Sequence, residues 1–222
     1  SILDDMEATV DRLRESFYKN RIFIDRTQGI GVITPADVEA YGLTGPLARS
    51  AGKAHDLRKH RPYLIYSELD FDVPVYHGGD CLDRYKVRLD EMDQSIRIVR
   101  QALKLLEPGP ISALDQKSAL PDKMSTYTDM ESLIHHFKLI MPGSEHGIHA
   151  PVTDLYSATE SPNGELGFYL VSDGSSNPWR VRVRPPSFIN YAIFSKLIEG
   201  VMLADVVAIL ASMNVIAGEL DR

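Results

Sequence analysis

The stretch ESPNGELGFYLVSDGSSNPWRVRVRPPSF, residues 160–188, says most about the fold. Asn163-Gly164 follows Pro162 and suits a tight hairpin turn, because glycine tolerates a positive φ. The run GELGFYLVS that comes next is rich in aromatic and aliphatic strand formers. The DGSS motif after it breaks the run and turns the chain again. These signals predict a small antiparallel β-meander over about residues 153–184.

The third strand of this meander carries a row of arginines. The run WRVRVR alternates strictly, which places Arg180, Arg182 and Arg184 on one face and two valines on the other. The two prolines that follow end the strand, since proline has no amide donor. Guanidinium groups on one strand face need carboxylates, a partner or an anion close by. Three acidic residues are candidates for neutralising them across the hairpin: Glu160, Glu165 and Asp173.

Most of the remaining chain has helical periodicity. Residues 2–19 form an amphipathic pattern, and Thr34-Pro35 opens a short helix that Gly42 ends. A long helix begins after Asp80 and stops before Pro108. Its apolar residues alternate steps of three and four, which predicts one narrow seam buried against other helices or a partner. Further helices are expected at 128–140 and across the apolar stretch 188–213, with irregular chain at 43–78 and a surface loop at 111–127.

Composition sets limits on the class of protein. The 222 residues are 44% hydrophobic and 25% charged, with a net charge of −7. This acidic balance predicts no general nucleic-acid binding. A single cysteine, Cys81, excludes an intrachain disulfide and is too few for a conventional iron–sulfur cluster. No uncharged apolar run is long enough to cross a bilayer, because the best one, residues 201–213, is short and contains Asp205.

Histidines offer weak candidates for a metal site. His135 and His136 are neighbours on an expected helix, so they point about 100° apart and do not face one metal together. His146 and His149 lie near Glu145 in a glycine-containing loop, a poorly placed set of ligands. Cys81 stands at an expected helix start, where a helix dipole can lower a thiol pKa, but a small buried residue is the favoured interpretation.

The meander and a series of motifs elsewhere resemble one family, the D subunits of the proton-pumping NADH:quinone oxidoreductase, respiratory complex I. The resemblance covers essentially the whole chain. Its motifs, in order, are Asn20-Arg21-Ile22-Phe23, GIGV at 29–32, LTGPLARSAG at 43–52, HDLRKHRPY at 55–63, FDVP at 71–74, GDCLDRYKVRLDEMDQSIRIV at 79–99, MESLIHHFK at 130–138, LADVVAIL at 203–210 and GELDR at 218–222.

The resemblance implies an α+β fold: a hydrogenase-large-subunit-like helical bundle, mainly α, with the small β-meander. We expect one compact unit over 1–222, with a helical core at about 1–140, the meander at about 153–184, and C-terminal helices and tail at 188–222. The family's chains begin with a His-rich N-terminal half that carries quinone head-group residues. The histidine and tyrosine motifs that carry these head-group residues are not found here. We therefore expect the chain to be a C-terminal portion whose N-terminal half is absent, and to be inactive in isolation.

The same resemblance implies a function. The chain would help form the quinone cavity beside the terminal iron–sulfur cluster of a partner subunit, within an NADH:quinone oxidoreductase of respiratory electron transport. It would bind no cofactor alone, and would take quinone as substrate and other complex I subunits as partners. Contact with the membrane would be indirect, at the cytoplasmic or matrix face of the energy-transducing inner membrane. The alternatives are a non-catalytic scaffold or assembly fragment, and a metal-free hydrogenase-like large subunit.

The related nickel–iron hydrogenases bind metal through a C-terminal Cys-x-x-Cys pair, whereas this tail reads SMNVIAGELDR at 212–222 without a cysteine. An amide, an aliphatic side chain and a bare backbone remain there: Asn214, Ile216 and Gly218 are the expected lining of the quinone cavity. A second set of charged residues is expected to form structural or interface ion pairs, which could also clamp a neighbouring subunit: Arg58, Glu160, Asp173, Arg180, Arg182 and Arg184. The same two interpretations, a structural ion pair or a contact with a neighbouring subunit, apply to Asp56 and Lys59 beside Arg58.

Overall fold

A computed structural model describes residues 2–109, 119–140, 150–175 and 177–221 of the chain. The fold is mainly helical with one three-stranded antiparallel sheet, as the sequence predicts. The chain groups into two compact units, whereas the sequence suggests one. The first comprises residues 1–106, 158–167 and 183–222, and the second comprises 107–157 and 168–182.

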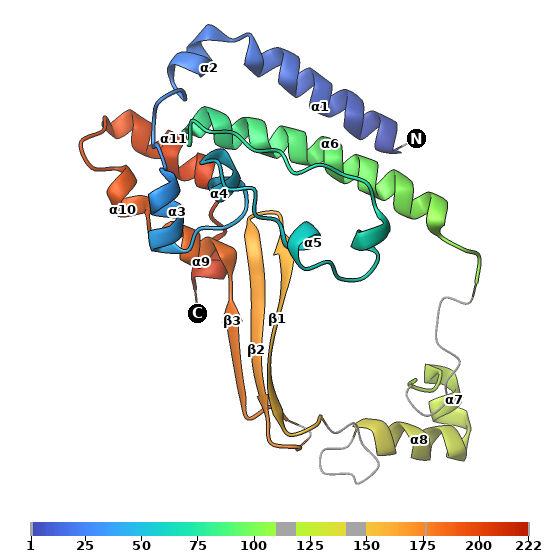
Figure 1. Ribbon diagram of the computed structural model, residues 1–222. Coiled ribbons are helices and arrows are strands. Elements are labelled where there is room, and N and C mark those ends of the chain that lie inside the picture. Colours follow the sequence, from blue (N-terminus) through green and yellow to red (C-terminus); the bar gives the residue numbers. More distant parts are fainter. Residues whose placement is uncertain (1, 110–118, 141–149, 176, 222) are drawn as a thin grey trace. The chain divides into compact units, whose positions relative to one another are not determined.

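Two long helices form one side of the first unit. Helix α1, Ile2–Tyr18, packs against helix α6, Cys81–Leu105, and the two run antiparallel (Figure 1). Ion pairs fix this direction, since Arg100 near the end of α6 bonds Asp4 near the start of α1 at 2.9 Å. At the other end of the pair, Arg14 of α1 bonds Asp93 of α6 at 2.5 Å. Helix α2, Arg21–Asp25, follows α1 with Asn20 as its N-cap.

The apolar seam of α6 is buried only in part. Leu89 and Ile96 are 3% and 4% exposed and pack with Val10 of α1. Further along the helix, Leu103 remains 59% exposed, and Met92 between the buried positions is 46% exposed. Residues 70–72 also lie along this part of α6, where the backbone N–H of Asp70 donates to Gln101 and Arg97 pairs with Asp72. They leave the apolar side chains of the C-terminal half of the seam exposed.

The second core of this unit brings distant segments together. Helix α3, Pro35–Tyr41, has the expected capping box at Thr34 and the left-handed Gly42 at its end. It packs with helix α4, Pro46–Ser50, and with α11, Leu203–Met213, around a buried apolar cluster. Most of 43–78 is irregular as expected, apart from α4, helix α5 at Leu57–His60 and a 3-10 turn at Tyr66–Glu68. The cluster consists of Ile33, Val38, Leu43, Leu47, Ala48, Ala51, Cys81, Ile193, Leu197, Ile209 and Met213.

The sheet has the strand order β1-β2-β3. Strand β1, Thr153–Ser161, and strand β2, Gly164–Ser172, are joined at the predicted hairpin turn, where Gly164 has a φ of 132°. Strand β3, Arg180–Arg184, follows the DGSS turn. The turn end of the hairpin belongs to the first unit, and the remainder of β1 and β2 to the second.

The C-terminal part is helical, as expected. Helices α9, Pro186–Tyr191, and α10, Phe194–Leu197, precede α11, and the short helix α12, Ala217–Leu220, ends the described chain. Although this stretch is strongly apolar, α11 is buried on one side only. Ile209 is 0% exposed and Met213 is 2% exposed, whereas Leu203 is 86% exposed and Val207 is 71% exposed.

The second unit contains two helices in addition to its strands. Helix α8, Met130–Ile140, matches the prediction. Residues 111–118 of the expected loop lie outside the described residues. The remainder of that loop prediction is wrong in part, because helix α7 occupies Lys123–Thr128. Asp122 starts this helix by accepting hydrogen bonds from the backbone N–H groups of Met124 and Ser125, a capping signal that the sequence prediction did not use. None of the described helices combines the length and apolar character needed to span a membrane.

Candidate functional site

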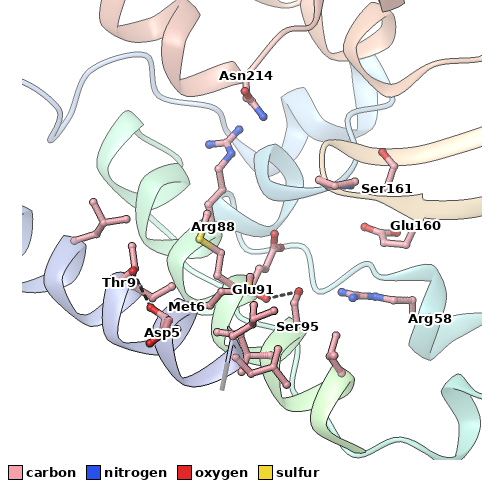
Figure 2. Close-up of a pocket in the computed structure, with 18 of the residues that line it drawn as sticks. Asp5, Met6, Thr9, Arg58, Arg88, Glu91, Ser95, Glu160, Ser161 and Asn214 are labelled. Atoms are coloured by element: carbon pink, nitrogen blue, oxygen red, sulfur yellow. Dashed lines mark hydrogen bonds between the residues drawn. The ribbon is translucent and has the colours of Figure 1, made fainter. Parts of the chain in front are cut away.

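A cavity of about 900 Å³ lies within the first unit, beside α6 (Figure 2). Its apolar wall comes from facing positions of the two long helices, including Met6 and Leu13 of α1 and Met92 and Val99 of α6. These residues belong to the amphipathic faces predicted from the sequence. Its polar wall contains Arg49, Arg58, Arg88, Glu91, Glu160 and Asn214.

Arg49 of α4 is the centre of a buried ion-pair cluster. Its side chain is 2% exposed and donates to Glu91 Oε1 at 2.6 Å and to Glu160 Oε1 at 2.9 Å. It also donates to the backbone oxygen of His55 at 2.8 Å. Burial works against the cation, but the charges of Glu91 and Glu160 outweigh this and raise the pKa of Arg49. The cluster therefore joins α4, α6 and the hairpin through one guanidinium.

A second pair adjoins this cluster. Arg58 donates to the two carboxylate oxygens of Asp56 at 3.0 and 2.7 Å, and Asp56 also caps α5 through the backbone N–H of Arg58. Burial acts to raise the pKa of Asp56, but the hydrogen bonds and charge of Arg58, with the charge of Arg49, lower it overall. For Glu91 burial has the larger effect and raises the pKa. The two carboxyl groups are thus shifted in opposite directions.

Arg88, one turn before Glu91 on α6, is arranged differently. Its Nη1 donates to the backbone oxygen of Arg84 at 3.2 Å. Its Nε and Nη2 are buried and have no hydrogen-bond partner among the described residues. Burial, followed by the neighbouring charge of Arg84, lowers the pKa of Arg88 to about 10. The group is still a cation at neutral pH, and Glu91, whose charge acts to raise this pKa, is already bonded to Arg49.

Asn214 contributes an amide to the same cavity. It ends α11 in a left-handed conformation with φ 54°. Its side-chain Nδ2 donates to Asn163 Oδ1 at 2.8 Å, and Asn163 Nδ2 donates to the backbone oxygen of Asn214 at 3.1 Å. In Figure 2 the Asn214 side chain and the Arg88 guanidinium point toward one another. An amide and an under-satisfied guanidinium therefore lie together on the polar wall of the cavity, opposite the apolar wall formed by the two long helices.

The other predicted tail residues lie outside the lining of this cavity. Ile216 is 50% exposed at the start of α12. Gly218 has open space where a side chain would be, since a Cβ added there meets no atom within 4 Å. The backbone N–H of Ile216 donates to Ser187 Oγ at 3.4 Å. The structure thus brings Asn214 to the cavity and leaves Ile216 and Gly218 on an exposed segment nearby in sequence.

The predicted ion-pair residues are distributed over several sites. Glu160 pairs with Arg49. Arg184 donates to the backbone oxygens of Glu165 and Gly42 and lies 3.9 Å from the Glu165 carboxylate. Arg180 and Arg182 are exposed and form no ion pair with a described residue. Asp173 accepts a hydrogen bond from the backbone N–H of Ser175, two residues later in its own turn.

The metal and thiol candidates acquire no ligand geometry in the described residues. No group of three His, Cys, Asp or Glu residues there is arranged to hold a metal ion. His146, His149 and Glu145 lie outside the described residues. Cys81 is 2% exposed, and its sulfur accepts a hydrogen bond from Arg84 Nη2 at 3.2 Å. Cys81 thus packs as a small buried residue.

Three residues of the cavity wall were not singled out by sequence reasoning: Arg49, Arg88 and Glu91. A signal exists for the first, because Arg49 is the one charged residue in the otherwise small and apolar run GPLARSAG. Glu91 and Arg88 resemble ordinary solvent-facing charges of a helix. The sequence assigns Asn163 a turn role, and its side-chain partner lies 51 residues away. Local patterns carry no information on contacts of that kind.

Comparison with known proteins matches the whole chain to one family. The family model for the 49 kDa subunit of respiratory-chain NADH dehydrogenase matches residues 1–222. The D subunit of the NADH-quinone oxidoreductase of Methylacidiphilum infernorum is 48% identical over 96% of this chain and 50% of its own length. The corresponding protein of Pelobacter propionicus is 47% identical, over 100% of this chain and 54% of its own.

A longer relative also matches the whole of this chain with only part of its own length. The C/D subunit of the NADH-quinone oxidoreductase of Bdellovibrio bacteriovorus is 46% identical over 100% of this chain and 39% of its own length. The chain therefore spans about half the length, or less, of these curated relatives. With a match that includes every residue, the chain belongs to the family of the 49 kDa subunit of respiratory-chain NADH dehydrogenase.

Proposed function

We propose that the chain contributes to the quinone-binding region of a proton-translocating NADH:quinone oxidoreductase, as part of the wall of its quinone cavity. The cavity of about 900 Å³ supports this most directly. Its wall between α1 and α6 is apolar, and its polar wall carries the amide of Asn214 beside the charged residues described above. An isoprenoid quinone needs this combination of an apolar slot and a few hydrogen-bonding groups.

In this proposal the reaction is the two-electron reduction of a membrane quinone by electrons that originate from NADH. The names of the relatives, which are D subunits of NADH-quinone oxidoreductases, support the assignment. The electrons arrive through the terminal iron–sulfur cluster of a neighbouring subunit, at the membrane's cytoplasmic or matrix face. The residues of this chain supply shape and hydrogen bonds, and the chain alone is inactive.

The exposed tail fits a role at a boundary between subunits. Ile216 presents half of its surface, and Gly218 leaves its backbone uncovered. Both would border a cavity completed by a neighbouring subunit. The buried cluster around Arg49 supports a second candidate, a non-catalytic scaffold, because such a cluster joins three elements without presenting a reactive group.

A substitution at Asn214 in the assembled complex distinguishes the two. Asn214→Gly keeps the left-handed backbone, which glycine adopts easily, and removes only the amide. We expect the apparent KM for a short-chain quinone to rise roughly five-fold, the effect of losing a hydrogen bond of about 1 kcal/mol. Assembly on native gels and NADH oxidation with an artificial acceptor that bypasses the quinone site should stay unchanged.

The control is Lys123→Ala, at an exposed position on α7. If Asn214→Gly has the same quinone kinetics as this control, the cavity-wall role is contradicted. The scaffold is then the remaining candidate function. A lower yield of assembled complex with normal quinone KM would favour the scaffold as well.

A further inference from the structure

The hairpin turn and the end of α11 are joined by a reciprocal pair of amides. Asn214 Nδ2 donates to Asn163 Oδ1 at 2.8 Å, and Asn163 Nδ2 donates to the Asn214 backbone oxygen at 3.1 Å. Asn163 is 5% exposed, so water competes little for its two bonds. One asparagine of the turn thus holds both the side chain and the backbone of Asn214.

Hydrogen bonds also hold this turn from its other side. Asn190, which is 1% exposed, donates through Nδ2 to the backbone oxygen of Asn163 at 3.0 Å. Its Oδ1 accepts from the backbone N–H of Thr44 at 3.3 Å, and Thr44 Oγ1 accepts from the backbone N–H of Glu165 at 3.1 Å. The backbone on each side of Gly164 is therefore anchored to the segment at Thr44.

Packing at the turn is as close as the hydrogen bonding. A Cβ added at Gly164 would lie 2.4 Å from Thr44 Oγ1, and one added at Gly45 would lie 2.6 Å from the backbone oxygen of Asn163. Neither position accepts a side chain without moving the other segment. The turn is therefore a fixed support for whatever Asn163 holds.

The consequence for Asn214 is a restricted amide. One of its two side-chain N–H groups is used by Asn163, which leaves the other N–H and Oδ1. Asn214 is exposed and lines the cavity, so these two groups are accessible to a ligand. A carbonyl oxygen can accept from the free N–H, and a hydroxyl can donate to Oδ1, which are the groups of a quinone and its quinol.

We infer that Asn163 is a positioning residue for quinone binding: it fixes which groups of the Asn214 amide are offered to the cavity. The inference rests on the proposed function, because it acts through Asn214. It predicts that Asn163 and Asn214 behave as one unit in quinone binding, although Asn163 does not line the cavity.

The test compares Asn163→Ala, Asn214→Gly and the double variant in the assembled complex. We expect each single variant to raise the apparent KM for a short-chain quinone by a similar factor, roughly five-fold. The double variant should show no larger change, since residues that act through one contact are not additive. The maximal rate at saturating quinone should change less than the KM.

Ile33→Val serves as the control for a general loss of stability, because Ile33 is a core residue at 2% exposure outside the cavity lining. If Asn163→Ala does not assemble, Asn163→Ser takes its place with a small polar side chain. An Asn163 variant that behaves like Ile33→Val while Asn214→Gly raises the KM would overturn the positioning role and leave the proposed function intact. A normal KM for Asn214→Gly would overturn both, and additive effects would overturn the positioning role alone.

Discussion

Arg49 and Arg88 line the same cavity, but only one of them is surrounded by carboxylates. Arg49 has Glu91 and Glu160 within 2.9 Å and is almost completely buried. Arg88 has two buried nitrogens without a partner among the described residues. A buried cation is costly unless it is paired and hydrogen-bonded. Arg49 therefore stabilises the fold through its ion pairs. The burial of Arg88 is not compensated by the described residues.

The first prediction tests the paired side of this comparison. Arg49→Met leaves Glu91 and Glu160 buried without their cation, so the unfolding free energy should fall by about 3–5 kcal/mol. Urea unfolding of the purified chain measures this change. Arg97→Met is the matched control on α6, because Arg97 pairs with exposed carboxylates and should cost at most about 1 kcal/mol. Equal losses in the two variants would show that the Arg49 cluster has no special role in stability.

The second prediction concerns pH. Asp56→Asn removes the carboxylate that Arg58 binds and should cost about 1.5–3 kcal/mol near neutral pH. The folded pKa of Asp56 lies below its ordinary value of 3.8, so its contribution is present above that pH and lost as the pH falls through the folded value. The stability gap between parent and variant should therefore narrow below 3.8 in urea melts at a series of pH values. If the difference in unfolding free energy stays constant with pH, the loss of stability in Asp56→Asn comes from packing and not from the charge of Asp56.

The third prediction tests the unpaired side. Arg88→Met removes a buried cation and keeps an apolar side chain of similar length, so the unfolding free energy should rise by about 1–2 kcal/mol. Arg61→Met, at an exposed position, should change stability by less than about 0.5 kcal/mol. Thermal melts of both variants measure the difference. A clear loss of stability in Arg88→Met would mean that the guanidinium is compensated in the folded chain, and the contrast with Arg49 would disappear.

The fourth prediction extends the comparison to the tail. Ile216→Phe enlarges an exposed side chain two residues after Asn214, so the fold should be little affected. In the assembled complex we expect the affinity for a quinone-site inhibitor to change by about 1 kcal/mol, roughly five-fold. Inhibitor titration measures this, with Lys123→Ala as the reference. Inhibitor affinity equal to that reference would remove Ile216 from the proposed cavity wall.

Local signals in the sequence were sufficient for most secondary structure. The capping residues at Thr34 and Asp80, the hairpin turn and the arginine strand all form as predicted, because each depends on neighbours in the chain. Burial was harder to predict. The seam of α6 and the apolar face of α11 are continuous in sequence, yet both are buried over only part of their length. Periodicity shows which side chains form an apolar face. It does not show whether another element packs against that face.

The sequence by itself determined the family, the mainly helical fold with its meander, and the presence of an asparagine rather than a thiolate at residue 214. Only the tertiary structure decided that Glu160 pairs with Arg49 and not with the arginine strand, and that Asn163 holds Asn214. These contacts join residues 111 and 51 positions apart. Such partners come within hydrogen-bond distance only when the folded chain brings distant segments together. Spacing along the sequence therefore does not predict them.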